Sequence, residues 1–309
     1  MKGFDCRQKN GLKLVPFFQS LVGEYDMHLY AHMFREDVAL AIMPIGGNSR
    51  RHPNFSTQLA GVDSDKALAL LKSVAGGKAR GDLNRIVSNA IEQVVKKLVW
   101  GGRVIYEIFT RDETLNVIYV SPRRTFYLPW VTVQFVPRAD REQCNRKYSI
   151  IRNSSVWRVS IPACLGGRRG YEKMIKSLRA VNPGAMPGFV HADMSLGVKS
   201  QGFNIQEYDL LQKVAINKAT ELWSWHQRES SEERQTEYYT VHKRAKFRFA
   251  QAILREHVIC EVNKLFVMTG LSCELSISGI PTSNDILLVL KQLQNGQINL
   301  GEVYDQTSV

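Results

Sequence analysis

The sequence predicts an α+β fold with a helical N-terminal part, a central antiparallel β meander, and a long helix followed by a short α/β C-terminal part. Three observations lead to this prediction. Apolar residues recur at helical spacing before residue 101 and again after residue 162, β-branched and aromatic runs fill the residues between, and an unbroken helical pattern occupies 230–269. The chain therefore divides into regions 1–100, 101–162 and 163–309.

The N-terminal region is expected to be helical in three places. Apolar residues fall at helical spacing over 17–43, over 64–76 and over 81–100. Asp63 and Asp65 stand at the start of the second pattern, where capping of a helix explains them best. A pair of glycines ends the third pattern and marks the change to strands.

The central region contains short β-branched and aromatic runs separated by turn-like segments such as TRDET and SPRR. These connections are too short to hold crossover helices, so the strands are expected to pair in antiparallel order as a meander. The expected strands are 103–109, 115–120, 125–128, 131–136, 148–151 and 156–161.

The C-terminal region is expected to be mostly helical. The glycine-rich turn GGRRGY leads into a helix over 171–180, and a Gly- and Pro-rich loop over 182–202 precedes a helix over 206–227. Glycines before a helix can turn backbone N–H groups toward a phosphate, although an ordinary strand-to-helix turn has the same composition. After the long helix, the pattern predicts a strand over 273–278 and a helix over 286–293.

The long helix is expected to begin at Ser230, which has capping-box spacing with Glu233, and to end before Gly270. Apolar residues lie on more than one of its faces, so more than one side must be covered. A central core helix meets this requirement, and so does a helix that packs on its own domain and on a neighbouring subunit. Its first half mixes cations with aromatic residues, which suits either a nucleic-acid contact or a solvated face.

Charge is the strongest compositional signal in the sequence. Lysine and arginine total 41 against 29 acidic residues, which gives a net charge of +12 and an isoelectric point near 9.5. Excess positive charge favours polyanions through the release of counterions. A nucleic-acid partner is therefore expected, with a protein partner or solubility alone as the alternatives.

Other features of the composition narrow the class of protein. No run of about 18 apolar residues occurs, so no membrane contact is expected, and the first residues do not form a convincing signal peptide. The five cysteines are scattered and form no CxxC pair. They indicate free thiols in a reducing compartment rather than a zinc site.

Catalytic motifs are not found in the sequence. It contains no GxSxG, no Walker GK[ST] ending and no GxGxxG near the glycine-rich turn. His28 and His32 form an i, i+4 pair that could bind a metal together with Asp26 or Glu36, and a metal-dependent nuclease would use the two histidines with Asp26. Because the segment HLYAH lacks the glutamate of HExxH, we expect no metal, no cofactor and no enzymatic activity.

The order of several segments resembles tailed-phage portal proteins. A helix ends in two glycines and enters RVIYEIF, a meander follows with SPRR at a turn, WRVSIP runs into GGRRGY, and the chain closes with QNGQINLGEV. The resemblance extends roughly from Leu83 to Val303. It implies a ring oligomer, commonly of twelve subunits, with a wing, a stem and a clip around a channel through which DNA is packaged. It also implies a location in the virion or the host cytoplasm.

We therefore expect a structural, portal-like ring protein that contacts double-stranded DNA through the phosphate backbone without reading bases. One alternative is a monomeric or dimeric basic nucleic-acid-binding protein of plasmid replication or phage defence, and another is the metal-dependent nuclease. The cations expected to neutralise phosphates are Lys243, Arg244, Lys246 and Arg248 on the long helix, Arg168 and Arg169 in the glycine-rich turn, and Arg138, Arg141, Arg146 and Lys147 in the central region.

Overall fold

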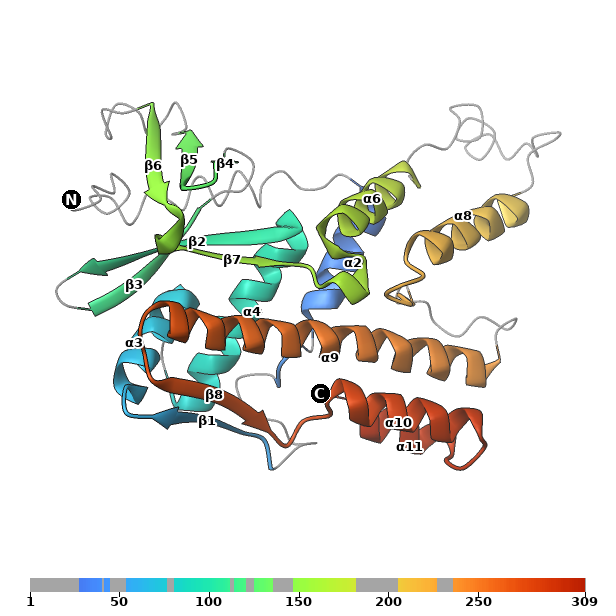
Figure 1. The fold of residues 1–309 in the computed structure, drawn as a ribbon. Coiled ribbons are helices and arrows are strands. Elements are labelled where there is room, and N and C mark those ends of the chain that lie inside the picture. Colours follow the sequence, from blue (N-terminus) through green and yellow to red (C-terminus); the bar gives the residue numbers. More distant parts are fainter. Residues whose placement is uncertain are drawn as a thin grey trace.

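A computed structural model describes residues 28–40, 42–44, 54–76, 81–111, 114–120, 125–135, 147–181, 205–226 and 236–308. The expected α+β class is confirmed, with helices around antiparallel sheets and one helix much longer than the rest (Figure 1). Across the described ranges, no helix combines the length and the apolar character that crossing a bilayer requires.

The long helix, α9, runs over Glu237–Met268 and passes through the middle of the molecule (Figure 1). Thr236 caps it, because its side chain accepts a hydrogen bond from the backbone N–H of Tyr239 at 3.3 Å. The backbone of Thr236 is extended, so a continuous helix from Ser230 is wrong. The expected capping pair of Ser230 and Glu233 lies outside the described residues.

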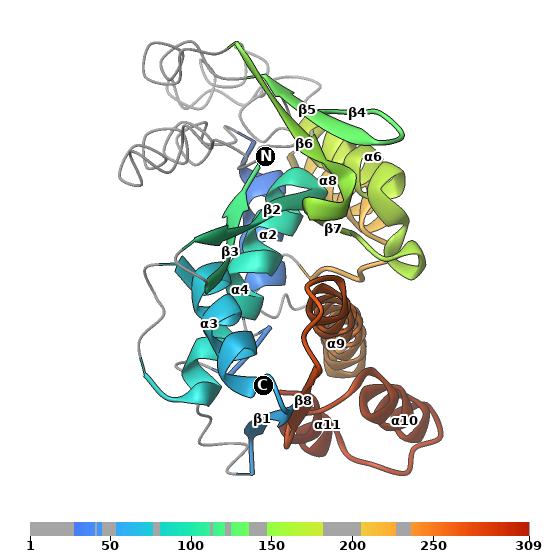
Figure 2. The same cartoon turned by 60° about the vertical axis from the view of Figure 1, so that its left-hand side comes forward.

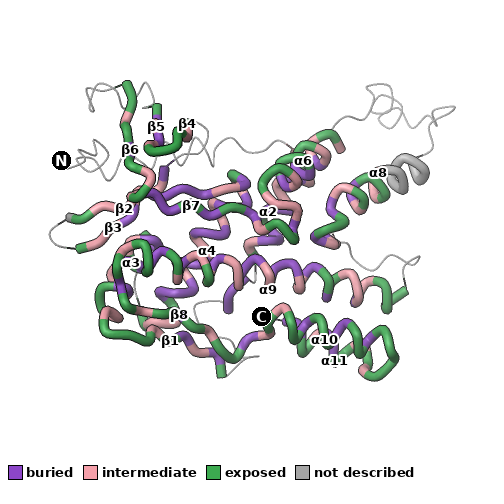
Figure 3. Tube along the Cα trace, in the orientation of Figure 1, coloured by how far each residue is buried: buried purple, intermediate pink, exposed green. Residues whose placement is uncertain are grey.

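One side of α9 packs into the main hydrophobic core. Its Phe247, Leu254, Val258 and Leu265 are buried there together with the apolar face of α4, Leu83–Gly101. Side chains from α2 (Leu29–Ala39), α3 (Ser64–Ala75) and the strands β2 (Arg103–Arg111) and β7 (Val156–Ser160) also contribute to this core. Figure 3 shows the buried residues concentrated along α4, β7 and α9.

The other side of α9 is covered by two helices that follow it in the sequence. Val241, Ala245 and Ala252 form a second core with α10, Ser283–Gln294, and α11, Leu300–Thr307. Figure 2 shows both helices beside α9, on the side away from α4. A neighbouring subunit is therefore not required on this side, because the chain covers it itself.

Polar contacts fix the end of α2 to α9. The side-chain N–H of Gln251 donates to the carbonyl oxygens of Asp37 at 2.9 Å and Leu40 at 2.8 Å, which satisfies groups that a helix end leaves open. The indole N–H of Trp225 donates to the Asp37 carboxylate at 2.8 Å. These buried contacts hold α2 in place between α9 and the segment that follows α8 (Ile205–Ala219).

The central strands divide between two sheets. In the first, β2 lies between β3 (Thr114–Tyr119) and β7, and in the second β5 (Val131–Phe135) lies between β4 (Thr125–Tyr127) and β6 (Tyr148–Arg152). Every pairing is antiparallel, as expected. The second sheet is a meander in sequence order, whereas β7 returns to pair with β2.

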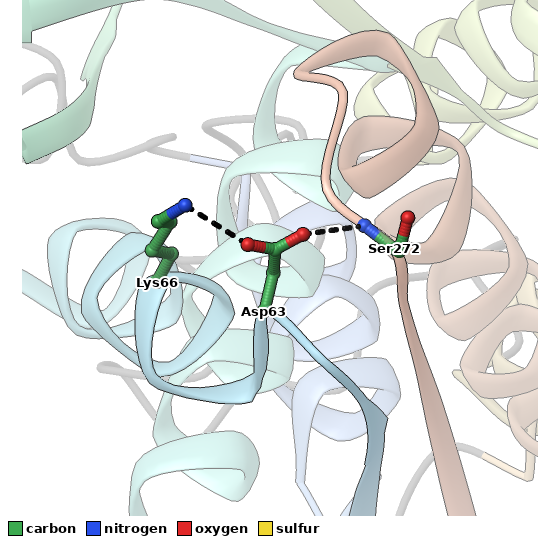
Figure 4. A network of polar contacts seen from close by, with 3 residues as sticks. All are labelled: Asp63, Lys66 and Ser272. Carbon is green, nitrogen blue, oxygen red and sulfur yellow. Dashed lines mark hydrogen bonds and ion pairs between the residues drawn. The ribbon is translucent and has the colours of Figure 1, made fainter.

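A further sheet joins distant parts of the chain. The strand β1, Ser56–Gly61, pairs antiparallel with β8, Cys273–Ser278. The sequence predicted β8 but not β1. Asp63 adds a polar link beside this sheet, because its carboxylate accepts from Lys66 at 2.9 Å and from the backbone N–H of Ser272 at 3.1 Å (Figure 4). Its side chain makes no cap hydrogen bond to α3, so the expected capping role is replaced by this link.

Candidate nucleic-acid interface

Two of the four cations predicted on α9 bind neighbouring side chains of the fold. The ammonium of Lys243 donates to the side-chain oxygen of Asn217 on α8 at 2.5 Å. The guanidinium of Arg248 donates to the side-chain oxygen of Gln251 at 2.9 Å. Both side chains are partly buried, so these two cations stabilise the packing of α9.

The other two cations on α9, Arg244 and Lys246, are exposed. Arg244 lies over the ring of Tyr304 on α11, with its guanidinium carbon 5.1 Å from the ring centroid. Tyr238 stacks on His242 with ring centroids 5.8 Å apart, and burial followed by the charge of Lys246 lowers the pKa of His242. A neutral imidazole beside exposed cations gives this end of α9 a positive, aromatic surface.

The helix α6, Gly167–Ala180, begins against the end of α4 and the start of β2. The hydroxyl of Tyr171 donates to the backbone carbonyl of Val99, which is in the last turn of α4. Gly166 and Gly167 have φ values of 90° and 58°, which let the chain turn sharply into the helix. This turn places the side chain of Arg168 beside Gly102, the residue before β2, and Nε of Arg168 donates to Glu172 at 2.7 Å.

Two further arginines, Arg103 and Arg158, enclose a tyrosine next to α6. The guanidinium carbons of both lie 4.5 Å from the ring centroid of Tyr127 on β4. Arg158 is held in this position because its guanidinium donates to the side-chain oxygens of Thr132 at 2.9 Å and Asn153 at 2.6 Å. Cation–π contacts of this kind fix the orientation of a guanidinium plane.

Arg103, Arg158 and Arg168 therefore form one positive group, which we call the arginine cluster. Burial lowers the pKa of Arg103, and the positive charges of Arg168 and Arg158 lower it further, while Tyr127 and Glu172 act in the opposite direction. Like charges this close repel one another, and an anion bound among them would remove the repulsion. Because a guanidinium presents paired N–H groups that match phosphate oxygens, a phosphate group is the anion that this geometry suits.

The remaining predicted cations are dispersed. Arg169 and Lys147 are exposed, on α6 and directly before β6, whereas Arg138, Arg141 and Arg146 lie outside the described residues. The structure thus places Arg168 with two arginines that the sequence did not single out. The α9 cations contact α8 and α11 and form a separate surface.

Sequence reasoning missed Arg103 and Arg158 because each is a single cation within a β-branched run. The pairing of β2 with β7 brings the two strands together, with Arg103 opposite Ser160 and Ile105 opposite Arg158. The signal that could have found Arg103 is its position directly after the two glycines that turn the chain from α4 into β2.

The histidine pair considered for a metal does not gather a complete set of ligands among the described residues. Nε2 of His32 lies 3.1 Å from the carboxylate of Glu36, and its ring meets Trp100 edge-on at 5.7 Å. Asp26, the proposed third ligand, lies outside the described residues. Within the described ranges, no group of three or more His, Cys, Asp or Glu residues could hold a metal ion.

Comparison of the chain with models of protein families, with curated proteins and with solved structures gives no match.

Proposed function

We propose that this protein is a non-enzymatic structural protein that binds double-stranded DNA through the sugar-phosphate backbone, as a subunit of a portal-like ring. The arginine cluster is the observation that carries the DNA contact. The guanidinium groups of Arg103 and Arg158 flank the ring of Tyr127, and the charge of Arg168, which is paired with Glu172, acts on Arg103. The net charge of +12 supports the same partner.

The cluster suits backbone binding better than the reading of bases. Arg158 is already fixed by Thr132, Asn153 and Tyr127, so it presents its charge in one orientation. The cluster draws its arginines from β2, β7 and α6, and the tyrosine between them from β4. Contacts to phosphates position a protein on DNA without carrying sequence information.

The salt dependence of duplex binding tests the cluster. Each phosphate contact contributes about 0.9 to the slope of the logarithm of the binding constant against the logarithm of salt concentration. The double variant Arg158→Gln, Arg168→Gln should therefore lower the slope by about 2 for each subunit that contacts the duplex, and weaken binding equally for unrelated duplex sequences. Fluorescence anisotropy between about 50 and 200 mM salt measures both quantities.

A variant with the same change in net charge is the control for this experiment. Lys264 and Lys291 are exposed cations on α9 and α10, away from the cluster, and Lys264→Gln with Lys291→Gln should leave the slope close to that of the wild type. If both double variants lower the slope equally, binding follows the net charge and the cluster is not the contact. Arg244→Gln with Lys246→Gln examines the α9 surface in the same assay.

A second candidate function is favoured by the packing of α9. Because α10 and α11 cover its second apolar face, the helix does not require a neighbouring subunit. A monomeric or dimeric basic nucleic-acid-binding protein of plasmid replication or phage defence would satisfy the same geometry. The mass of the assembled protein separates the two candidates.

A further inference from the structure

The second sheet carries apolar side chains on the face that points away from the body of the protein. The residues of β5 alternate, with Thr132 and Gln134 buried and Phe135 exposed. The pairing register places Phe126 and Ile150 beside Val133, and Tyr148 beside Phe135. We call this surface the outer face; it consists of Phe126, Leu128, Val131, Val133, Phe135, Tyr148, Ile150 and Arg152.

The outer face is exposed to an extent unusual for such side chains. Phe126 is 61% exposed, Tyr148 54% and Ile150 60%, and Trp130, in the turn between β4 and β5, is 82% exposed. Figure 3 shows most of β6 as exposed. A contiguous apolar surface of this kind marks a binding site more often than chance exposure does.

The aromatic rings on the outer face form one group. Phe126 and Phe135 meet edge-to-face with centroids 5.5 Å apart, and Tyr148 lies opposite Phe135 across the strand pair. Rings on adjacent strands of a sheet form a platform on which the bases of a single strand can stack, because every base has a π-face. Bases in a duplex are already stacked on one another and do not offer that face.

The charge of this sheet is complementary to a polyanion. Residues 125–135 and 147–152, which form the strands and the turn between β4 and β5, contain no aspartate and no glutamate. Lys147 and Arg152 are exposed at the two ends of β6. Lysine is depleted at protein interfaces, so Lys147 beside the aromatic rings of a sheet without acidic residues fits a phosphate backbone better than a protein partner.

We propose that the outer face binds single-stranded nucleic acid, with bases stacked on Phe126, Phe135 and Tyr148 and phosphates near Lys147 and Arg152. This site lies on the opposite side of the sheet from Tyr127 and the arginine cluster, because Tyr127 pairs with the buried Thr132. The inference is therefore independent of the duplex contact proposed above.

Titration of the full chain with oligo(dT) and oligo(U) tests the proposal. Of the five tryptophans, Trp130 is exposed, Trp100 is half-buried, and Trp157, Trp223 and Trp225 are buried. Quenching that is lost in Trp130→Phe therefore reports occupation next to the outer face. The variant Phe126→Leu, Phe135→Leu, Tyr148→Leu keeps the surface apolar but removes the rings. Its affinity for oligo(dT) should fall at least about tenfold. Equal binding of both oligomers indicates a general site, and a preference indicates which nucleic acid it serves.

Further variants make the result decisive. The double variant Lys147→Gln, Arg152→Gln should lower the salt slope of oligo(dT) binding by about 0.7 for each phosphate that is no longer neutralised. The control Leu288→Ala, at an exposed apolar position on α10, should change neither the affinity nor the slope. The leucine variant should keep the affinity of the wild type for duplex DNA. If the Arg158→Gln, Arg168→Gln variant loses duplex binding but keeps its affinity for oligo(dT), the outer face is still supported as a separate site.

Two outcomes would overturn the inference. One is unchanged oligo(dT) affinity in the leucine variant, or no binding by the wild type. The other is a wild type that is oligomeric and does not bind oligo(dT), together with a Phe135→Glu variant that is monomeric. That result would assign the outer face to contact between copies of the chain. Circular dichroism of each variant should match the wild type, because the substituted side chains are exposed.

Discussion

Lys97, on α4, is a lysine whose ammonium lies among aromatic rings. Its Nζ donates to the hydroxyl of Tyr106 at 3.1 Å and lies 4.9 and 5.1 Å from the ring centroids of Tyr106 and Tyr119. Burial lowers the pKa of Lys97 to about 8. The faces of the two rings attract the cation, but they do not replace the water that it loses.

This environment predicts how stability changes with pH. The unfolded chain keeps the Lys97 proton up to about pH 10.4, whereas the folded protein releases it near its pKa of about 8. Between these values the unfolded state binds more protons, so the free energy of unfolding rises with pH, by on the order of 2 kcal/mol. Lys97→Met removes this rise, because methionine fills similar space and does not titrate.

Urea unfolding at about pH 7.5 and about pH 9.5 measures the effect, since tyrosine ionisation in the unfolded chain lies mostly above this range. Lys72→Met, at an exposed position on α3, should keep the rise of the wild type. A parallel pH dependence in the wild type and the Lys97 variant would show that the folded protein holds the Lys97 proton as firmly as the unfolded chain does.

At the scale of elements, the β1–β8 pair depends on a close approach of backbone at Gly279. This residue follows β8 with a φ of 78°, and a Cβ at this position would collide with the carbonyl group of Asn54, just before β1. Gly279→Ala should therefore destabilise the protein by about 3 kcal/mol, through left-handed strain and displacement of the backbone.

Gly296 is the matched control for this prediction. It has a φ of 68° after α10, but a Cβ there would meet no atom within 4 Å. Gly296→Ala should cost only the strain, about 1 kcal/mol. Chemical unfolding compares the two variants, and equal losses of stability would mean that the contact with Asn54 relaxes freely.

Elements defined by local signals were predicted from the sequence, and those defined by distant partners were not. The helix α4 ends where the two glycines predict, and Thr282 caps α10 through a capping box with Asp285. The strand β1 is short, and its partner lies near the other end of the chain, so no local pattern shows it. The start of α9 was placed too early because Ser230 and Thr236 both have hydroxyl side chains that can cap a helix. The structure shows that Thr236 caps α9.

At the scale of the whole molecule, the candidate site was predicted only in part. The sequence groups cations by their proximity along the chain, and this found Arg168 together with the α9 cations. Folding regroups them, because Lys243 turns to Asn217 while Arg103 and Arg158 join Arg168 from two strands. The net charge is the basis of the proposed class of partner, whereas the position of the proposed contact depends on strand pairing that no local pattern records.

The assembly state is the remaining prediction at this scale. The portal-like order of elements predicts a ring, so the protein in native buffer should have a mass that is a large multiple of 35.1 kDa. The contact between subunits must then use surfaces other than the sides of α9 that α4, α10 and α11 cover. Native mass spectrometry or light scattering at micromolar concentration makes the measurement.

A monodisperse monomer or dimer would reject the ring but not the arginine cluster, since the cluster is complete within one chain. The salt dependence separates the cases further. A closed ring around a duplex presents its arginine cluster many times, so its slope should exceed that of a single subunit several-fold. The double variant Arg158→Gln, Arg168→Gln changes every copy of the chain at once. In a ring, the decrease in slope should therefore be multiplied by the number of subunits that contact phosphate, whereas in a monomer the decrease should be about 2.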